Sequence, residues 1–187
     1  LYALLSFGLG GDERVQKALA HLAGLARANG WPCAGNMAKF RGPGRKEDAC
    51  PYANLIMLKA LALSPVWRVS PPPRAVAYAA LQLCQSRLQL HPYIFYMGTD
   101  FEKLKAPLVW YDLLHVCEVL TRFPHLRGDG RLLEMLALLR AKADSEGRYT
   151  PESVWLAWKD WEFGQKKVPS RWLTLLAQRC LERAALI

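Results

Sequence analysis

The chain has 187 residues, of which 52% are hydrophobic and 22% are charged, a composition that is typical of a folded globular protein and excludes a disordered one. No apolar run reaches the roughly 18 uncharged residues of a membrane-spanning helix, and the first residues lack the pattern of a secretory signal. The net charge of +9 favours an anionic partner: a phosphorylated small molecule, an acidic membrane surface or a nucleic acid.

The five cysteines form no CxxC pair, and their odd number argues against a disulfide framework. We therefore expect a reduced, cytoplasmic protein. A nucleic-acid function has the least support among the anionic partners, because no recognition motif accompanies the positive charge.

The chain begins within an apolar segment, LYALLSFGL, which matches the end of a buried helix. Leu1 precedes Arg14 by the same 13 residues that separate Leu55 from Arg68, and an Arg-Val pair ends both segments. We therefore expect residues 1–187 to form a single domain from the C-terminal part of a longer chain. Its first helix would then lack a hairpin partner and leave an apolar face bare.

Three segments carry apolar residues at the spacing of an amphipathic helix. The first runs from Arg14 to Gly30, the second begins at Arg74, and the third runs from Arg131 to Gly147. The first and third each span 16 residues from arginine to glycine, and the three arginines are 60 and 57 residues apart. Glycine is a frequent stop after a helix. The apolar stripes are Val15, Leu19, Leu22, Leu25 and Ala26 in the first segment, and Leu132, Met135, Leu136 and Leu139 in the third.

Three more uniformly apolar segments alternate with these, as buried helices do. They read YANLIMLKALAL, WYDLLHVCEVLTRF and RWLTLLAQRCLERA, and their aromatic markers Tyr52, Trp110 and Trp172 are 58 and 62 residues apart. The sequence therefore predicts an all-α fold of six to seven helices and almost no sheet, arranged as about three and a half hairpins with the more polar helices outside. A period of this length indicates a closed ring or a solenoid. It exceeds the about 40–47 residues of HEAT and armadillo repeats, although an open α-solenoid is the alternative.

The repeat pattern resembles the α/α toroid of terpenoid cyclases and protein prenyltransferases, and most of all the small bacterial proteins described as prenyltransferase-like. In that fold, amphipathic outer helices end in a turn similar to DG-x-W, and buried inner helices line a central cavity. ANGWPC and SEGRYTPES resemble this turn, with Trp31 and Tyr149 as its aromatic residue. The resemblance covers nearly the whole chain as a pattern and implies a partial toroid, which missing N-terminal repeats or a partner subunit would complete. The chain lacks the Asp-x-Asp-Asp and Asp-Asp-x-x-Asp motifs, which argues against terpene cyclisation.

The loops before the buried helices carry a repeated basic pattern. K-x-P-x-x-W occurs at Lys105 and again at Lys167, and Lys46 begins a looser copy. Basic residues at a helix N-terminus are unfavourable by about a few tenths of a kcal/mol unless an anion is present. In a toroid these N-termini share one rim, so the pattern predicts a basic rim that binds diphosphate; the alternative is solvated loops. The predicted substrate-binding residues are Arg41, Arg45, Lys46, Lys103, Lys105, Lys166, Lys167, Arg171, Trp110, Trp172 and Tyr52.

The segment GRKEDACPY contains an Asp-x-Cys step at Asp48 and Cys50. Protein prenyltransferases hold a catalytic zinc through such a step and a histidine on the next inner helix. The resemblance implies zinc bound by Asp48, Cys50 and either Asp112 or His115, and zinc accepts all three donor types. The chain departs from the family pattern, because aligning Tyr111 with the family's tyrosine puts Asp112 where the histidine should be. The residues by themselves favour an ordinary helix start, with Asp48 as the N-cap, Cys50 as a small core residue and His115 as a core histidine.

The repeat pattern and the basic loops together indicate two alternative functions. The first is a protein that binds an isoprenoid or prenyl diphosphate, with prenyl transfer as the activity that the resemblance implies. The second is a non-enzymatic helical-repeat binding or scaffold module with an anion-binding rim.

Three tryptophans are spaced by three residues: Trp155, Trp158 and Trp161. This spacing predicts that they share one helical face, which packs in the core or lines the site of an apolar ligand.

Overall fold

The computed structural model of the chain describes residues 1–28, 30–31, 50–89, 101–109 and 111–185. Within these residues the seven α-helices are α1 (Tyr2–Ser6), α2 (Glu13–Gly24), α3 (Pro51–Leu61), α4 (Pro71–Gln89), α5 (Leu113–Leu120), α6 (Gly130–Ala141) and α7 (Arg171–Ala185). Single 3-10 turns are η1 (Leu9–Gly11), η2 (Pro124–Leu126), η3 (Leu156–Trp158) and η4 (Glu162–Gly164). Two short strands, β1 (Lys105–Ala106) and β2 (Ser153–Val154), pair in parallel. The prediction of a mostly helical, all-α chain is confirmed for the part that the structure describes.

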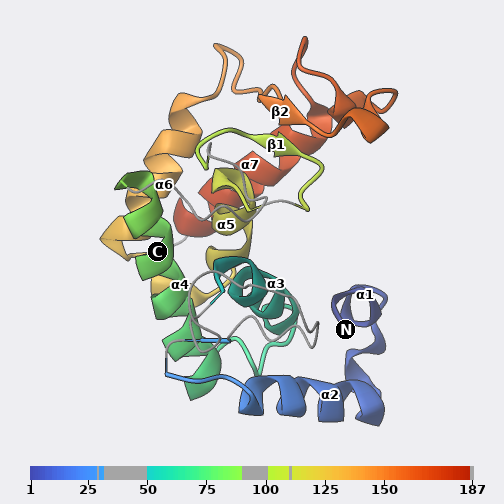
Figure 1. Cartoon of the computed structure of the whole chain (residues 1–187), viewed down its shortest axis with the longest axis vertical. Helices are drawn as coiled ribbons and strands as arrows, with labels where there is room; N and C mark the ends of the chain where they lie inside the picture. Colours follow the sequence, from blue (N-terminus) through green and yellow to red (C-terminus); the bar gives the residue numbers. More distant parts are fainter. Residues whose placement is uncertain (29, 32–49, 90–100, 110, 186–187) are drawn as a thin grey trace, which may run out of the picture.

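The helices pack in two rows (Figure 1). In the inner row α1 packs on α3, α3 on α5, and α5 on α7. In the outer row α2 packs on α4, and α4 on α6. The hairpins α3–α4 and α5–α6 connect the rows. Alternate helices of the chain therefore belong to the same row, as the two types of helical segment in the sequence predict.

The burial of the helices differs both between and within the rows, and α1 of the inner row has no buried residue. All eight residues of α5, in the middle of the inner row, are buried. In contrast, α2 and α6 of the outer row bury one stripe each and expose the opposite face, as amphipathic helices do. The helix α7 differs from the uniformly buried helix that the sequence predicts, because Trp172 and Leu175 are about half exposed. Among the described elements α7 packs mainly on α5, α6 and η4.

The amphipathic helices are shorter than predicted. Both α2 and α6 end six residues before the glycine predicted as their stop. After α6 the carboxylate of Asp144 accepts hydrogen bonds from the backbone N–H groups of Glu146 and Arg148, each at 2.9 Å. Such side-chain bonds compete with the helix for backbone donors, and this explains why α6 ends early.

The first of the two predicted turns is at Trp31. Gly30 has φ +104°, which an L side chain rarely adopts, and Trp31 is buried with its indole N–H donating to the carbonyl of Leu22 (2.9 Å). The backbone N–H of Trp31 donates to Oδ1 of Asn54 in α3 (3.1 Å). The Trp31 carbonyl accepts from Nδ2 of Asn54 (3.0 Å) and from the N–H of Cys50 (3.1 Å). The turn is thereby bound to the start of the next inner helix.

The second predicted turn repeats this arrangement. Gly147 has φ +74°, and Tyr149 is buried. The N–H of Tyr149 donates to Oγ1 of Thr174 in α7 (3.0 Å), and its carbonyl accepts from the N–H of Ser170 (2.8 Å). The internal repeat therefore extends from the sequence period to matching hydrogen bonds.

The start of α5 differs from the predicted register. The N-cap of α5 is Asp112, whose side chain accepts from the third N–H that follows. Tyr52 and Trp172 lie in the first turns of α3 and α7, whereas Trp110 precedes the N-cap of α5 by two positions. The three aromatic markers are therefore not equivalent, because a good capping residue begins α5 after Trp110.

Candidate functional site

The entrances of α3, α5 and α7 are neighbours. In α3, the Tyr52 hydroxyl donates to the carbonyl of Val109 in the loop before α5 (2.7 Å). Burial, together with a smaller effect of Cys50, raises the pKa of this tyrosine. In the same loop β1 pairs with β2, which belongs to the segment that leads to α7, with Lys105 opposite Ser153. Hydrogen bonds thus connect the three helix entrances in order.

The predicted rim residues occupy different environments. Those that are exposed are Lys103, Lys166, Lys167 and Arg171, with Trp172 about half exposed. Lys105 is buried, which contradicts its predicted place on an open rim. The reason is that β1 pairs with β2 and that the Lys105 N–H donates to Oδ2 of Asp112 (2.7 Å). Arg41, Arg45, Lys46 and Trp110 lie outside the described residues.

Asp112 is a fully buried carboxylate that joins the entrance loop to α5. One oxygen accepts from the N–H of His115 (2.7 Å) and the other from the N–H of Lys105 (2.7 Å). Burial raises the pKa of Asp112 to about 7, although these two hydrogen bonds and the charge of Lys105 act to lower it. The side chain therefore titrates near neutral pH while it caps the helix.

The predicted zinc ligands are only partly described. Asp48 lies outside the described residues, and the N-cap of α3 is Cys50 rather than Asp48. The Sγ of Cys50 accepts a hydrogen bond from the first turn of α3 (3.5 Å), and both oxygens of Asp112 accept from backbone donors. Among the described residues no group of three His, Cys, Asp or Glu side chains could hold a metal ion. Zinc binding that includes Asp48 therefore stays a prediction.

The contacts of Cys50 favour the helix-start alternative, and a substitution tests it. We expect Cys50→Ala to leave the metal content of the purified protein unchanged and to lower the free energy of unfolding by about 1 kcal/mol through the loss of a cap and of core packing. Mass spectrometry of the metal content and urea denaturation measure the two effects. One zinc per wild-type chain that disappears in the variant, with an affinity that falls as the pH is lowered, would instead establish the metal site.

A set of polar side chains crosses the inner row from α1 to α7, and we name it the polar band. It consists of Tyr2, Lys59, His115, Glu118, Arg122 and Arg183. Nζ of Lys59 lies 5.1 Å from the ring centroid of Tyr2 and 3.1 Å from Nε2 of His115. A charged ammonium only donates, so in that state Nε2 of His115 accepts the hydrogen bond. Burial lowers the pKa of Lys59, although the nearby charge of Glu118 raises it.

Glu118 is the buried carboxylate at the centre of the band. It accepts a hydrogen bond from Nε of Arg122 (2.9 Å) and lies 3.8 Å from Nη1 of Arg183. Burial by itself would raise the pKa of Glu118, but Arg122, Arg183 and Lys59 together hold it below its usual value. The side chains of Arg122 and Arg183 remain 23% and 20% exposed. Three cations therefore lie near one carboxylate, and the side chains of the two arginines are partly exposed to solvent.

The polar band was not predicted from the sequence, although a signal was present. Lys59 and Glu118 each stand within a uniformly apolar segment, and a charged residue there is seldom buried without a partner. The partners come from other helices, such as Arg183 of α7, and their pairing cannot be read from spacing along the chain.

The predicted tryptophan face is wrong in its geometry. Trp155, Trp158 and Trp161 lie in and around the turns η3 and η4 rather than on one α-helix. Trp158 is partly buried and its ring contacts that of Trp161 at 5.5 Å between centroids. Trp155 and Trp161 are about half exposed, so core packing does not hold for them. A spacing of three also fits the 3-10 helix, which explains the error.

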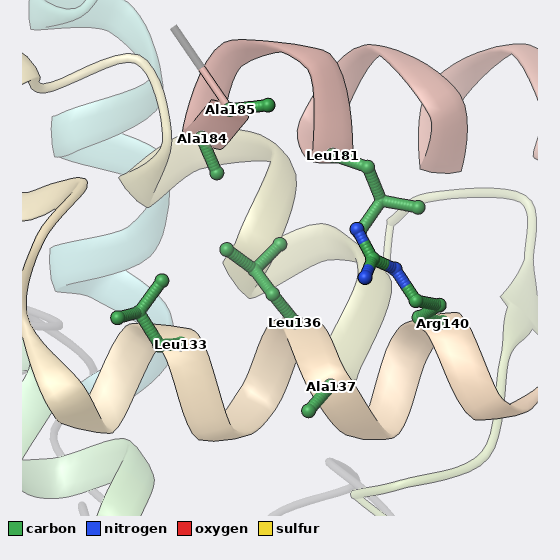
Figure 2. A pocket seen from close by; sticks show the side chains of 7 residues that line it. All are labelled: Leu133, Leu136, Ala137, Arg140, Leu181, Ala184 and Ala185. Carbon is green, nitrogen blue, oxygen red and sulfur yellow. The ribbon is translucent and has the colours of Figure 1, made fainter. Parts of the chain in front are cut away.

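A groove of about 230 Å³ lies between α6 and α7 (Figure 2). Its lining consists of Leu133, Leu136, Ala137, Arg140, Leu181, Ala184 and Ala185. Arg140 is the one charged side chain among these seven, and none of them is a nucleophile, an acid or a metal ligand. The polar band is therefore the better candidate for a functional site.

Comparison of the chain with protein-family models, curated proteins and solved structures gives no match. Of the helices that the structure describes, none has the length and apolar character needed to cross a bilayer.

Proposed function

We propose that the chain is a prenyltransferase-like protein of the α/α-toroid type that binds a prenyl diphosphate or a similar phosphorylated apolar molecule. The polar band carries the proposal, because Arg122 and Arg183 pair with the Glu118 carboxylate and the charge of Lys59 acts on the same carboxylate. A diphosphate needs several cations within reach, and the arginine fork matches phosphate geometry. The apolar side chains of the inner row suit an isoprenoid chain.

Two features support the toroid arrangement. Alternate helices form an inner and an outer row, and the turns at Trp31 and Tyr149 bond to the next inner helix in the same way. In a toroid the inner row lines the central cavity, and the polar band would then face that cavity. About three and a half hairpins make a partial ring, which further repeats or a partner subunit would complete.

A transferase activity needs a group that exchanges a proton with the bound molecule, and Lys59 is the best placed. Burial lowers the pKa of Lys59, and its Nζ lies 3.1 Å from Nε2 of His115. A transferase activity would use this pair.

The second candidate function is a non-enzymatic binding or scaffold module that holds an anion at its basic rim. The exposure of Lys103, Lys166 and Lys167 along adjoining helix entrances favours it. In this case the anion would bind at the entrances and not at the polar band.

Calorimetry with farnesyl diphosphate separates these candidates. We expect Lys59→Met and Arg183→Met each to weaken binding by about tenfold or more, because a hydrogen bond to a charged group contributes about 1.5–3 kcal/mol. Methionine keeps the alkyl volume in both variants. Arg131→Met, on the outer row, is the matched control and should bind as the wild type does. Farnesol should bind more weakly than its diphosphate.

A triple variant, Lys103→Met with Lys166→Met and Lys167→Met, tests the rim. Loss of binding in this variant, with the two band variants unchanged, would favour the scaffold module. If the folded wild-type chain gives no heat with farnesyl diphosphate, the proposal that it binds a prenyl diphosphate is contradicted, with or without a transferase activity.

A further inference from the structure

Residues 155–172 form a lobe beyond the N-terminal end of α7 (Figure 1), and we name it the aromatic lobe. It contains η3, η4 and the first two residues of α7. Its exposed large apolar side chains are Trp155, Leu156, Trp161, Val168 and Trp172. Leu156 is 75% exposed and Val168 is 58% exposed, far more than a side chain that packs in a core. All five belong to one short segment of the chain, and large exposed apolar patches mark interaction surfaces.

Side-chain hydrogen bonds connect residues within the lobe. The side-chain oxygen of Gln165 accepts from the N–H groups of Lys167 (2.6 Å) and Val168 (2.9 Å). Its Nε2 donates to the carbonyl of Val168 (2.8 Å). The carboxylate of Glu162 accepts from the N–H of Arg171 (2.6 Å) at the start of α7. The exposed apolar groups therefore stand on a structured loop.

Aromatic packing within the lobe supports the same conclusion. The Trp161 ring is stacked on Phe163 at 5.7 Å, with 29° between the planes, and contacts Trp158 edge-on at 5.5 Å. A Cβ atom at Gly164 would collide with the carbonyl oxygen of Trp158, so this close approach requires glycine. Trp161 remains 57% exposed although its ring is held by two neighbours.

The charges of the lobe are mostly positive. Its cations are Lys159, Lys166, Lys167 and Arg171, and its carboxylates are Asp160 and Glu162. Glu162 is exposed, but its carboxylate accepts hydrogen bonds from the Ser170 hydroxyl and from the N–H of Arg171 at the start of α7. The lobe thus combines apolar side chains with an excess of positive charge.

We propose that the aromatic lobe docks on the surface of an anionic lipid bilayer. Tryptophan is enriched at the bilayer interface, and basic residues are attracted to anionic headgroups. The aliphatic side chains of Leu156 and Val168 favour a bilayer over a single-stranded nucleic acid. Acyl chains can surround an aliphatic side chain, whereas a nucleic-acid base needs an aromatic ring on which to stack. Contact through one lobe makes the association peripheral.

Sedimentation of the full chain with vesicles tests the proposal. Vesicles of phosphatidylcholine that contain phosphatidylglycerol should bind the chain, and vesicles of phosphatidylcholine alone should bind it much more weakly. We expect Lys166→Gln with Lys167→Gln to lower the partition coefficient by about tenfold or more, since each basic residue near an anionic surface accounts for about fivefold. We expect Leu156→Ser with Val168→Ser to lower it by a similar factor; neither side chain belongs to the ring cluster, so the lobe should keep its fold.

Matched controls come from other faces of the molecule. Leu133→Ser with Leu138→Ser removes two exposed apolar groups from α6, and Lys17→Gln with Arg179→Gln removes two exposed charges from α2 and α7. Both controls should bind vesicles as the wild type does. Equal losses in the lobe and control variants would mean adsorption by net charge and would overturn the proposal. Absence of vesicle binding, or displacement from the lobe by single-stranded DNA, would overturn it too.

Discussion

Asn54→Ala is expected to lower the free energy of unfolding by about 3 kcal/mol, the largest stability effect of a single polar side chain that we predict. Asn54 is fully buried and bonds both backbone groups of Trp31, and its Nδ2 also donates to the carbonyl of Cys50 (2.7 Å). Truncation leaves the Trp31 N–H buried without its partner, which costs about 1–3 kcal/mol, and adds a small cavity. Urea denaturation of the two proteins measures the difference.

Thr174→Val is the matched comparison, because Thr174 occupies the equivalent place beside Tyr149 and makes one bond to it instead of two. We expect this nearly isosteric change to lower the free energy of unfolding by about 1–2 kcal/mol.

Gly30→Ala should lower the free energy of unfolding strongly. The new Cβ would collide with Oδ1 of Asn54, and residue 30 has a positive φ. The destabilisation by Gly30→Ala should be smaller in the Asn54→Ala background, because the variant lacks the Oδ1 atom with which the Cβ collides. If Asn54→Ala changed the free energy of unfolding by less than about 0.5 kcal/mol, Asn54 would not anchor the turn.

The free energy of unfolding is expected to decrease as the pH rises from about 4 to about 7, with Asp112 as the responsible group. In the unfolded chain this carboxyl has its ordinary pKa of 3.8, whereas burial raises the folded-state pKa to about 7. Between these values the folded protein binds more protons than the unfolded one, so stability falls with increasing pH. In the middle of this range Asp112 contributes roughly 1.4 kcal/mol per pH unit to the decrease in the free energy of unfolding. Urea denaturation at a series of pH values measures it.

Asp112→Asn removes the titrating group and keeps a residue that can cap α5. We expect the pH dependence between about 4 and 7 to become flatter in this variant. Glu118 acts in the opposite direction: its pKa is held below the usual value, so its contribution is present above the ordinary pKa of 4.5 and is lost as the pH falls further. The two effects therefore occupy different pH ranges. An unchanged slope in Asp112→Asn would show that Asp112 is charged in the folded protein throughout.

Several local features of this chain could be predicted from its sequence. The stripe of Leu132, Met135, Leu136 and Leu139 predicts the buried face of α6, and all four residues are buried. The turns predicted at Gly30 and Gly147 are present, each with a positive φ before a buried aromatic residue, although the helices end six residues before these glycines. Patterns of this kind are local, because helical periodicity and glycine conformations depend on residues only a few positions apart.

The helices, the alternation of polar and apolar helical segments and the period of the repeat can all be predicted from the amino-acid sequence. Which charged residues meet depends on the tertiary structure. Lys105 is buried because β1 pairs with a strand that begins 48 residues later, and Glu118 meets Arg183 because α5 packs on α7. Only the packed structure shows that Trp161 stands on an exposed lobe rather than in the core. The physical reason is that contacts between distant segments depend on how the elements pack, which is not encoded in the spacing of residues along one helix.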